Sequence, residues 1–353
     1  MTTLLTGVTA RRVPTDRLTV NVLEVPDRTG EPLVYVHGNV SSGLFWQRAL
    51  LDAPDGYRPL ALDLRGFGDT DPEPVDATRG VRDYSDDVVA ALAALDLGPA
   101  HLLGWSLGGG VVLQVLRDHP EVVRSLILVN PVSPYGFGGT RGLDGELTDP
   151  SGAGSGGGTA NPDFVRLLSE GDTSEDSPLS PRQVMHTFYV RPPLRLEDAD
   201  VFVGSMLSTR IGDDHYPGDA TVVDAWPGVA PGRRGVLNTM APTHFRLDDL
   251  HVVEPKRPIL WLRGADDQIV SDASMFDLAN LGALGAVPGW PGERTHPPQP
   301  MVGQTRAVLD RYAEAGGSYR EVVFEECGHS PHLEHPARFR AALAEHLAAT
   351  RET

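Results

Sequence analysis

One short turn constrains the fold of this chain more than any other feature. The sequence Gly104-Trp105-Ser106-Leu107-Gly108 stands between an apolar run at 99–103, typical of a buried strand, and an apolar helix face at 111–116. Gly-x-Ser-x-Gly at a strand-to-helix corner predicts a strained turn, because only small neighbours let the backbone segments pass so closely. We expect the Ser106 hydroxyl to project above a sheet, beside a helix N-terminus that favours negative charge.

Strand-like and helix-like runs alternate on both sides of this turn. Apolar runs predict strands at 18–25, 32–36, 59–63 and 122–129, and residues 83–95 are typical of a helix with acidic residues in its first turn. The alternation resumes near the end of the chain, with strands predicted at 257–264 and 319–325 and helices at 302–315 and 335–349. This order predicts the α/β class, with a mostly parallel central sheet and helices on both faces.

The alternation breaks in the middle of the chain, where Gly, Pro, Ser and Asp dominate and only short helical pieces occur. A glycine-rich stretch there, 152–158, lacks the Gly-Lys-Ser/Thr ending of a phosphate-binding loop and is predicted to be a plain loop. We therefore predict a core made of residues 1–130 and 256–353, with residues 131–255 inserted as a cap (lid) over the carboxyl ends of the strands. Open α/β sheets bind their ligands at that edge.

Composition limits the function classes. The chain has 353 residues, of which 40% are hydrophobic and 22% charged, which is ordinary for a globular protein. Its formal net charge of −18 argues against nucleic acid as a partner, and no apolar run reaches the ~20 residues of a membrane span. The first residues do not resemble a secretory signal, and the single cysteine, Cys327, leaves no internal disulfide. We expect a cytoplasmic protein whose partner is a small-molecule substrate, with no membrane or nucleic-acid partner.

A histidine after the last predicted strand is the candidate general base. His329 lies in the sequence Cys-Gly-His-Ser on a loop at the sheet edge, where an imidazole can reach the serine. The nearby His332 and His335 raise the alternative of a metal site. A zinc site needs three or four converging ligands, however, and the His335-Pro336 sequence looks like the start of a helix. We predict no metal and no organic cofactor.

Two further features complete the machinery of a nucleophilic serine. Asp266 and Asp267 follow the strand predicted after the insert, and either can orient the histidine while the other caps the turn. For an oxyanion hole, the backbone N–H groups of Asn39 and Leu107 are candidates, because Asn39 follows a buried strand and Leu107 follows the serine. The pieces occur in the chain order Ser, Asp, His.

Together these motifs resemble the α/β-hydrolase superfamily over nearly the whole chain. The matching residues are His37-Gly38-Asn39, Asp63-Leu64-Arg65-Gly66-Phe67-Gly68, Gly104-Trp105-Ser106-Leu107-Gly108, Gly264-Ala265-Asp266-Asp267 and Gly328-His329. In the family's Gly-x-x-Asp pattern the acid is the third residue after the glycine. The resemblance therefore implies Asp267 rather than Asp266, and a catalytic triad of Ser106, Asp267 and His329.

The resemblance also narrows the reaction. Dehalogenases and epoxide hydrolases of this fold use an aspartate where Ser106 stands, and perhydrolase-type members carry an aromatic residue where Asn39 stands. The pocket is predicted to be apolar, lined by Val40, Trp46, Trp105, Phe137, Phe188, Tyr189 and Met206. We predict an esterase- or lactonase-like enzyme that cleaves a carboxylic ester or lactone of a fairly bulky, apolar small molecule through an acyl-enzyme on Ser106. A carbon–carbon bond hydrolase and a non-catalytic ligand-binding protein of the same fold are the alternatives.

Overall fold

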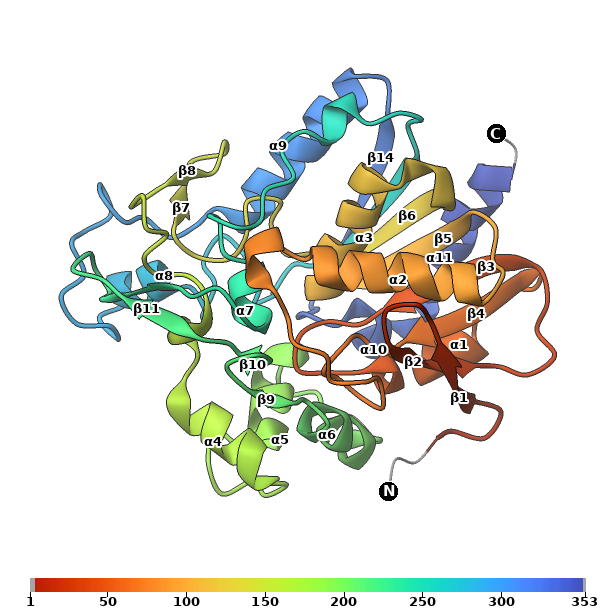
Figure 1. Cartoon of the computed structure of the whole chain (residues 1–353), viewed down its shortest axis with the longest axis horizontal. Coiled ribbons are helices and arrows are strands. Elements are labelled where there is room, and N and C mark those ends of the chain that lie inside the picture. Colours follow the sequence, from red (N-terminus) through yellow and green to blue (C-terminus); the bar gives the residue numbers. More distant parts are fainter. Residues whose placement is uncertain (1–3, 352–353) are drawn as a thin grey trace.

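A single eight-stranded sheet organises the protein, and Figure 1 shows it in a computed structural model that describes residues 4–351. In chain order its strands are β1 (Thr9–Pro14), β2 (Thr19–Glu24), β3 (Glu31–Val36), β4 (Tyr57–Leu62), β5 (Ala100–Trp105), β6 (Val123–Val129), β13 (Pro258–Gly264) and β14 (Ser318–Phe324). The order across the sheet is β1-β2-β4-β3-β5-β6-β13-β14. The strands from β4 to β14 are parallel, and β1 and β2 form an antiparallel edge.

Helices cover both faces of the sheet. The helices outside the insert are α1 (Gln47–Leu51), α2 (Arg82–Ala94), α3 (Leu107–Asp118), α8 (Leu278–Ala283), α9 (Met301–Glu314), α10 (Pro331–Glu334) and α11 (Pro336–Arg351). In Figure 1, α2 and α3 lie in front of the sheet and α11 lies behind it, where it packs against β6 and β13. Strand β5 is buried along its whole length, as expected of a strand covered on both faces. The predicted fold class is confirmed.

Some elements of the core were not predicted. The predicted C-terminal helix corresponds to α11, which begins at Pro336 as expected, but the short α10 before it was not predicted. Strand β1 was not predicted, because four of its first five residues are exposed and it shows no alternation of apolar and polar residues. Helices α1 and α8 were not predicted either. The remaining core strands and helices begin and end within a few residues of their predicted limits.

Residues 131–255, predicted as the insert, lie between β6 and β13 along the chain, and they are called the inserted segment here. Figure 1 shows its elements at one side of the sheet. They are short: β7 (Thr140–Arg141), β8 (Glu146–Leu147), α4 (Pro162–Glu170), α5 (Pro181–Val184), a π-helical turn (Met185–Tyr189), α6 (Ala199–Leu207), β9 (Ile211–Gly212), β10 (Tyr216–Pro217), β11 (Ala220–Val222), β12 (Val229–Pro231) and α7 (Val236–Thr239). Within residues 4–351, no helix combines the length and hydrophobicity that a bilayer crossing requires.

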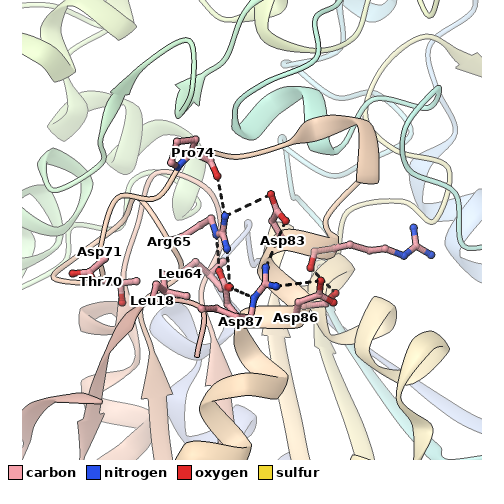
Figure 2. Close-up of polar contacts among 12 residues, drawn as sticks. Leu18, Leu64, Arg65, Thr70, Asp71, Pro74, Asp83, Asp86 and Asp87 are labelled. Carbon is pink, nitrogen blue, oxygen red and sulfur yellow. Dashed lines mark hydrogen bonds and ion pairs between the residues drawn. The ribbon is translucent and has the colours of Figure 1, made fainter. Parts of the chain in front are cut away.

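A charged network fixes the loop that follows β4. Figure 2 shows Arg65 of this loop between Asp87 and Asp83 of α2. The Arg65 guanidinium donates to both carboxylate oxygens of Asp87 at 2.6 and 2.8 Å and to the carbonyl of Pro74 at 2.8 Å. Arg65 and Asp87 are both buried, so their bidentate pairing offsets the desolvation of two charges.

The loop held by Arg65 is also where the inserted segment attaches to the core. The Val75 N–H donates to the carbonyl of Asp214 at 3.0 Å, and the carbonyl of Val75 accepts from the N–H of Gly235 at 3.1 Å. The Ala77 N–H adds a third backbone bond, to Arg233 at 2.9 Å. Backbone bonds of this kind fix position without depending on side-chain chemistry. The core therefore sets where this part of the inserted segment lies.

Candidate active site

Ser106 occupies the tight turn that the sequence predicts between β5 and α3. Its backbone has φ 56° and ψ −119°, a conformation that side-chain-bearing residues rarely adopt and that usually marks a functional position. The two flanking glycines are required by close approaches. A Cβ on Gly104 would lie 2.2 Å from the carbonyl oxygen of Gly108, and one on Gly108 would lie 2.4 Å from that of Val36. The Ser106 N–H donates to Val129 of the adjacent strand at 3.0 Å, which ties the turn to the sheet.

Asp267 and His329 form a buried pair at the same sheet edge. Nδ1 of His329 lies 2.8 Å from Oδ2 of Asp267, and both side chains are 2% exposed. The other carboxylate oxygen of Asp267 accepts from the backbone N–H groups of Ile269 and Val270. A carboxylate bonded to Nδ1–H leaves the lone pair of the imidazole on Nε2, the nitrogen needed by a general base. Asp266 points elsewhere and pairs with Arg191 of the inserted segment at 2.7 Å.

Three side chains hold the backbone on either side of His329. Nε1 of Trp105 and Nδ2 of Asn130 donate to the His329 carbonyl at 2.8 and 2.7 Å. The Glu334 carboxylate accepts from the N–H groups of Gly328 and Ser330, the residues before and after His329. Sequence reasoning missed Asn130 and Glu334 as supports. Asn130 carries a local signal, since an asparagine directly after a buried strand tolerates its observed φ of 39°.

The loop after β3 lies directly above the serine. A Cβ on Gly38 would lie 3.0 Å from the Cβ of Ser106, so the backbone of this loop passes the nucleophile at close range. His37 shapes the loop from below: its Nε2 accepts from the N–H of Leu64 at 2.9 Å. Burial lowers the pKa of His37 to about 4, which keeps the ring neutral and able to accept. The Asn39 and Leu107 N–H groups, predicted to form an oxyanion hole, belong to this loop and to the first turn of α3.

A largely apolar cavity of about 260 Å³ opens over these groups. Ser106, His329 and Asn39 line it together with apolar side chains from the core and from the inserted segment. Among residues 4–351, those that line it include no Asp, Glu, Lys or Arg. A ligand that fills this cavity gains affinity mainly by burying apolar surface and finds no buried cation to pair with an anionic group.

Of the seven residues predicted to line the pocket, the structure places five on this cavity and two away from it. Val40, Trp105, Phe137, Phe188 and Tyr189 line the cavity, whereas Trp46 and Met206 do not. Trp46 is fully buried behind the site, where its ring packs against His332 at a centroid distance of 4.2 Å. Met206 is fully buried in the apolar core, so its side chain is not available to a ligand.

Sequence reasoning missed much of the cavity wall. The missed apolar residues of the inserted segment and of the chain after β13 are Phe164, Leu179, Val184, Tyr216, Leu237, Met240, Ile269, Val270, Met275, Phe276, Leu278 and Leu281. The chain after β13 did carry a usable signal, because its apolar residues Met275, Leu278 and Leu281 recur every three positions. The inserted segment carried none, since its wall residues come from loops and very short elements.

The two further histidines of the C-terminal run have separate surroundings. His332 is buried between the rings of Trp46 and Trp105, and its pKa is held well below the ordinary value by burial and by the neighbouring His329. His335 lies outside this packing and its Nε2 is 3.2 Å from the carbonyl of Glu326. Across residues 4–351, no three His, Cys, Asp or Glu side chains are grouped as a metal site would need.

Comparison with known proteins agrees with this architecture. A family model described as alpha/beta hydrolase fold matches residues 31–150. The chain is 40% identical over 121 residues to a Variovorax paradoxus (strain S110) protein provisionally named carbamate hydrolase RutD, covering 33% of this chain and 44% of that protein. It is 35% identical over 118 residues to 2-hydroxymuconate semialdehyde hydrolase of Pseudomonas sp. (strain CF600), covering 33% of this chain and 41% of that enzyme. The matched region thus spans less than half the length of these relatives.

Similarity to solved structures extends over the whole chain. The esterase RhEst1 from Rhodococcus sp. ECU1013 superposes with a TM-score of 0.59 over 97% of this chain and 99% of that chain, at 23% identity. An identity this low shows the fold alone. The local sequence match includes the strand-to-helix turn at Ser106, and the structural match extends to the strands that precede Asp267 and His329. The chain therefore has the α/β-hydrolase fold, and its residues 31–150 match the model of that family.

Proposed function

We propose that this protein is a serine hydrolase that cleaves a carboxylic ester or lactone of an uncharged, apolar small molecule. The observation that carries the proposal is the buried Asp267–His329 pair, with 2.8 Å between Oδ2 and Nδ1, whose histidine lines a cavity that Ser106 also lines. An oriented imidazole beside a serine at a strained turn is the arrangement that activates a hydroxyl for acyl transfer.

The proposed reaction follows from the roles of these groups. Nε2 of His329 takes the proton of the Ser106 hydroxyl as its oxygen attacks the ester carbonyl. Asp267 stabilises the resulting imidazolium, and the N–H groups of Asn39 and Leu107 stabilise the negative oxygen of the tetrahedral intermediate. His329 then gives its proton to the leaving alcohol. In the second half-reaction it activates the water that releases the acid from Ser106.

The cavity favours an uncharged substrate. An anionic substrate would lose its hydration on entering a wall without Lys or Arg, and burial of an unpaired charge is costly. This consideration disfavours a substrate with carboxylates, such as the succinate derivative for which another relative is named. A carbon–carbon bond hydrolase acting on an uncharged substrate remains the second candidate, since one relative is named 2-hydroxymuconate semialdehyde hydrolase.

The test is labelling with a fluorophosphonate, followed by intact-mass measurement and peptide mapping. We expect one label per chain on Ser106 in the wild type and none in Ser106→Ala. A screen of p-nitrophenyl esters and apolar lactones should then show turnover that falls by about 10⁴-fold or more in Ser106→Ala and in His329→Ala. Near-normal turnover in either variant contradicts the mechanism. Ligand binding without labelling would instead favour a binding protein, and labelling without ester cleavage would favour carbon–carbon bond hydrolysis.

A further inference from the structure

One tyrosine of the inserted segment brings a phenol hydroxyl to a largely apolar wall, in which Thr159 and Asn161 are the other polar residues of that segment besides Tyr189. Tyr216 begins β10 and lines the cavity. Its backbone is held on both sides, because its N–H donates to the carbonyl of Arg210 at 3.1 Å and the carbonyl of His215 accepts from Val236 at 2.7 Å. Its ring packs edge-on against Phe164 of α4, with 6.4 Å between the centroids. The side chain is therefore positioned before any ligand binds.

The hydroxyl of this tyrosine is not used by the protein. Tyr216 is 5% exposed, yet its Oη makes no hydrogen bond to any of residues 4–351. Tyr189, on the same cavity wall, differs: its Oη donates to the carbonyls of Asn39 and Val40 at 3.1 and 3.2 Å. The hydroxyl of Tyr216 is not one of the fully buried unpaired atoms among residues 4–351, so it is open to the cavity, where a ligand oxygen can replace water as its partner.

The chemistry of the group defines its partner. Burial raises the pKa of Tyr216 far above that of an ordinary tyrosine, so the phenol keeps its proton at any working pH and acts as a neutral donor. The scissile carbonyl is already assigned to the N–H groups of Asn39 and Leu107. The acceptor for Tyr216 must therefore be a different oxygen of the ligand.

We propose that Tyr216 Oη donates a hydrogen bond to a second oxygen of the substrate, and that the preferred substrates are uncharged apolar esters or lactones that also carry a ketone, ether or hydroxyl oxygen away from the cleaved bond. The proposal rests on the proposed function for the identity of the cleaved bond. A donor in a dry wall selects strongly, because a substrate without the acceptor leaves the hydroxyl unpaired.

The experiment compares p-nitrophenyl octanoate with a series of p-nitrophenyl oxo-octanoates, in which the ketone moves along the acyl chain. In the wild type we expect one ketone position to be preferred over its neighbours. Tyr216→Phe should lower kcat/KM for that ester by about 10-fold and change the value for the octanoate far less. The matched control is Tyr57→Phe, whose hydroxyl donates to the carbonyl of Leu347 in the core, outside the cavity. It should leave the ketone preference intact.

Two further readouts keep this proposal separate from the proposed function. The first readout is calorimetry, which measures how non-hydrolysable analogues bind to Ser106→Ala. These analogues carry CH₂ in place of the ester oxygen, so the measurement needs no turnover. In these analogues the octanoate becomes a monoketone and the preferred oxo-octanoate becomes a diketone. Adding Tyr216→Phe should weaken binding of the diketone about 10-fold and should change binding of the monoketone little. In addition, Tyr216→Phe should not lower the thermal unfolding midpoint, since it removes an unpaired hydroxyl. Equal effects on both analogues, or a stability loss with no ketone dependence, would assign Tyr216 a packing role and overturn the proposal.

Discussion

The carboxyl edge of the sheet and the inserted segment both line the cavity, but they are held in place differently. At the sheet edge, Ser106, Asn130, Asp267 and His329 each follow a strand of the parallel part, β5, β6, β13 and β14. These four strands are neighbours in the sheet, so pairing register alone brings residues from distant parts of the sequence within reach of one another.

The inserted segment has no such sheet and is held by backbone bonds to core loops and by a buried side chain that joins its own loops. Asn238 of α7 is fully buried, and its Oδ1 accepts from the N–H groups of Gly157 and Gly232 at 2.8 and 3.0 Å. Its Nδ2 donates to the carbonyls of Asp219 and Arg234 at 2.8 and 2.6 Å. One amide thus joins three loops, at Gly157, at Asp219 and at 232–234. The sheet therefore positions the side chains proposed to react, whereas local polar contacts determine the shape of the pocket.

The largest effect is expected at the sheet edge, from a comparison of two neighbouring aspartates. Asp267→Asn should lower kcat by about 10²–10⁴-fold, because an amide in place of the carboxylate stabilises the wrong tautomer of His329. Asp266→Asn, which breaks only the half-exposed pair with Arg191, should be tolerated far better. Steady-state kinetics with the best ester measures both. The opposite ranking would mean that Asp266 orients the histidine.

The same contrast explains what the sequence could and could not predict. Ser106, Asp267 and His329 each follow a strand that the sequence pattern predicts, so the prediction of one shared sheet edge came from the strand order. Tyr216 and Met240 lie in very short elements or turns, where no periodicity exists to read, and their approach to the cavity is set by backbone bonds to distant loops. Trp46 was misplaced for a related reason: an aromatic residue near a predicted site gives no indication of which side of its turn the ring occupies.

An intermediate effect is expected when each region loses its central asparagine. Asn238→Ala leaves two buried N–H groups and two carbonyls without their partner, and should lower the free energy of unfolding by about 2–4 kcal/mol. Limited proteolysis should then cut within residues 131–255 first. At the sheet edge the matched change is Asn130→Gly, since glycine accepts the φ of 39° without strain.

The two asparagine variants should separate by their kinetics. Asn130→Gly frees the carbonyl of His329 from one of its two donors and should lower kcat, about 10-fold, more than it changes protease resistance. Asn238→Ala should raise KM more than it lowers kcat, because the cavity wall loosens while the sheet edge is intact. Identical kinetic changes in both variants would contradict the idea that the two regions are held independently.

We expect the smallest effect from a change of one pH unit on the acid side, which should lower the free energy of unfolding through buried histidines of the core. Burial lowers the pKa values of His37 and His346 to about 4 in the folded protein, against about 6.5 in the unfolded chain. Between these values the unfolded state binds more protons, so stability is fully present above pH 6.5 and falls as the pH drops toward 4. Each group adds a slope of up to about 1.4 kcal/mol per pH unit in that window. His346→Leu should therefore show a shallower loss of stability between pH 6.5 and 4.5 in urea unfolding. At pH 8, where the histidine is neutral in both states, the difference between the two proteins gives only the packing cost of the substitution. An unchanged acid slope would mean that His346 is protonated in the folded helix α11 and would contradict this prediction.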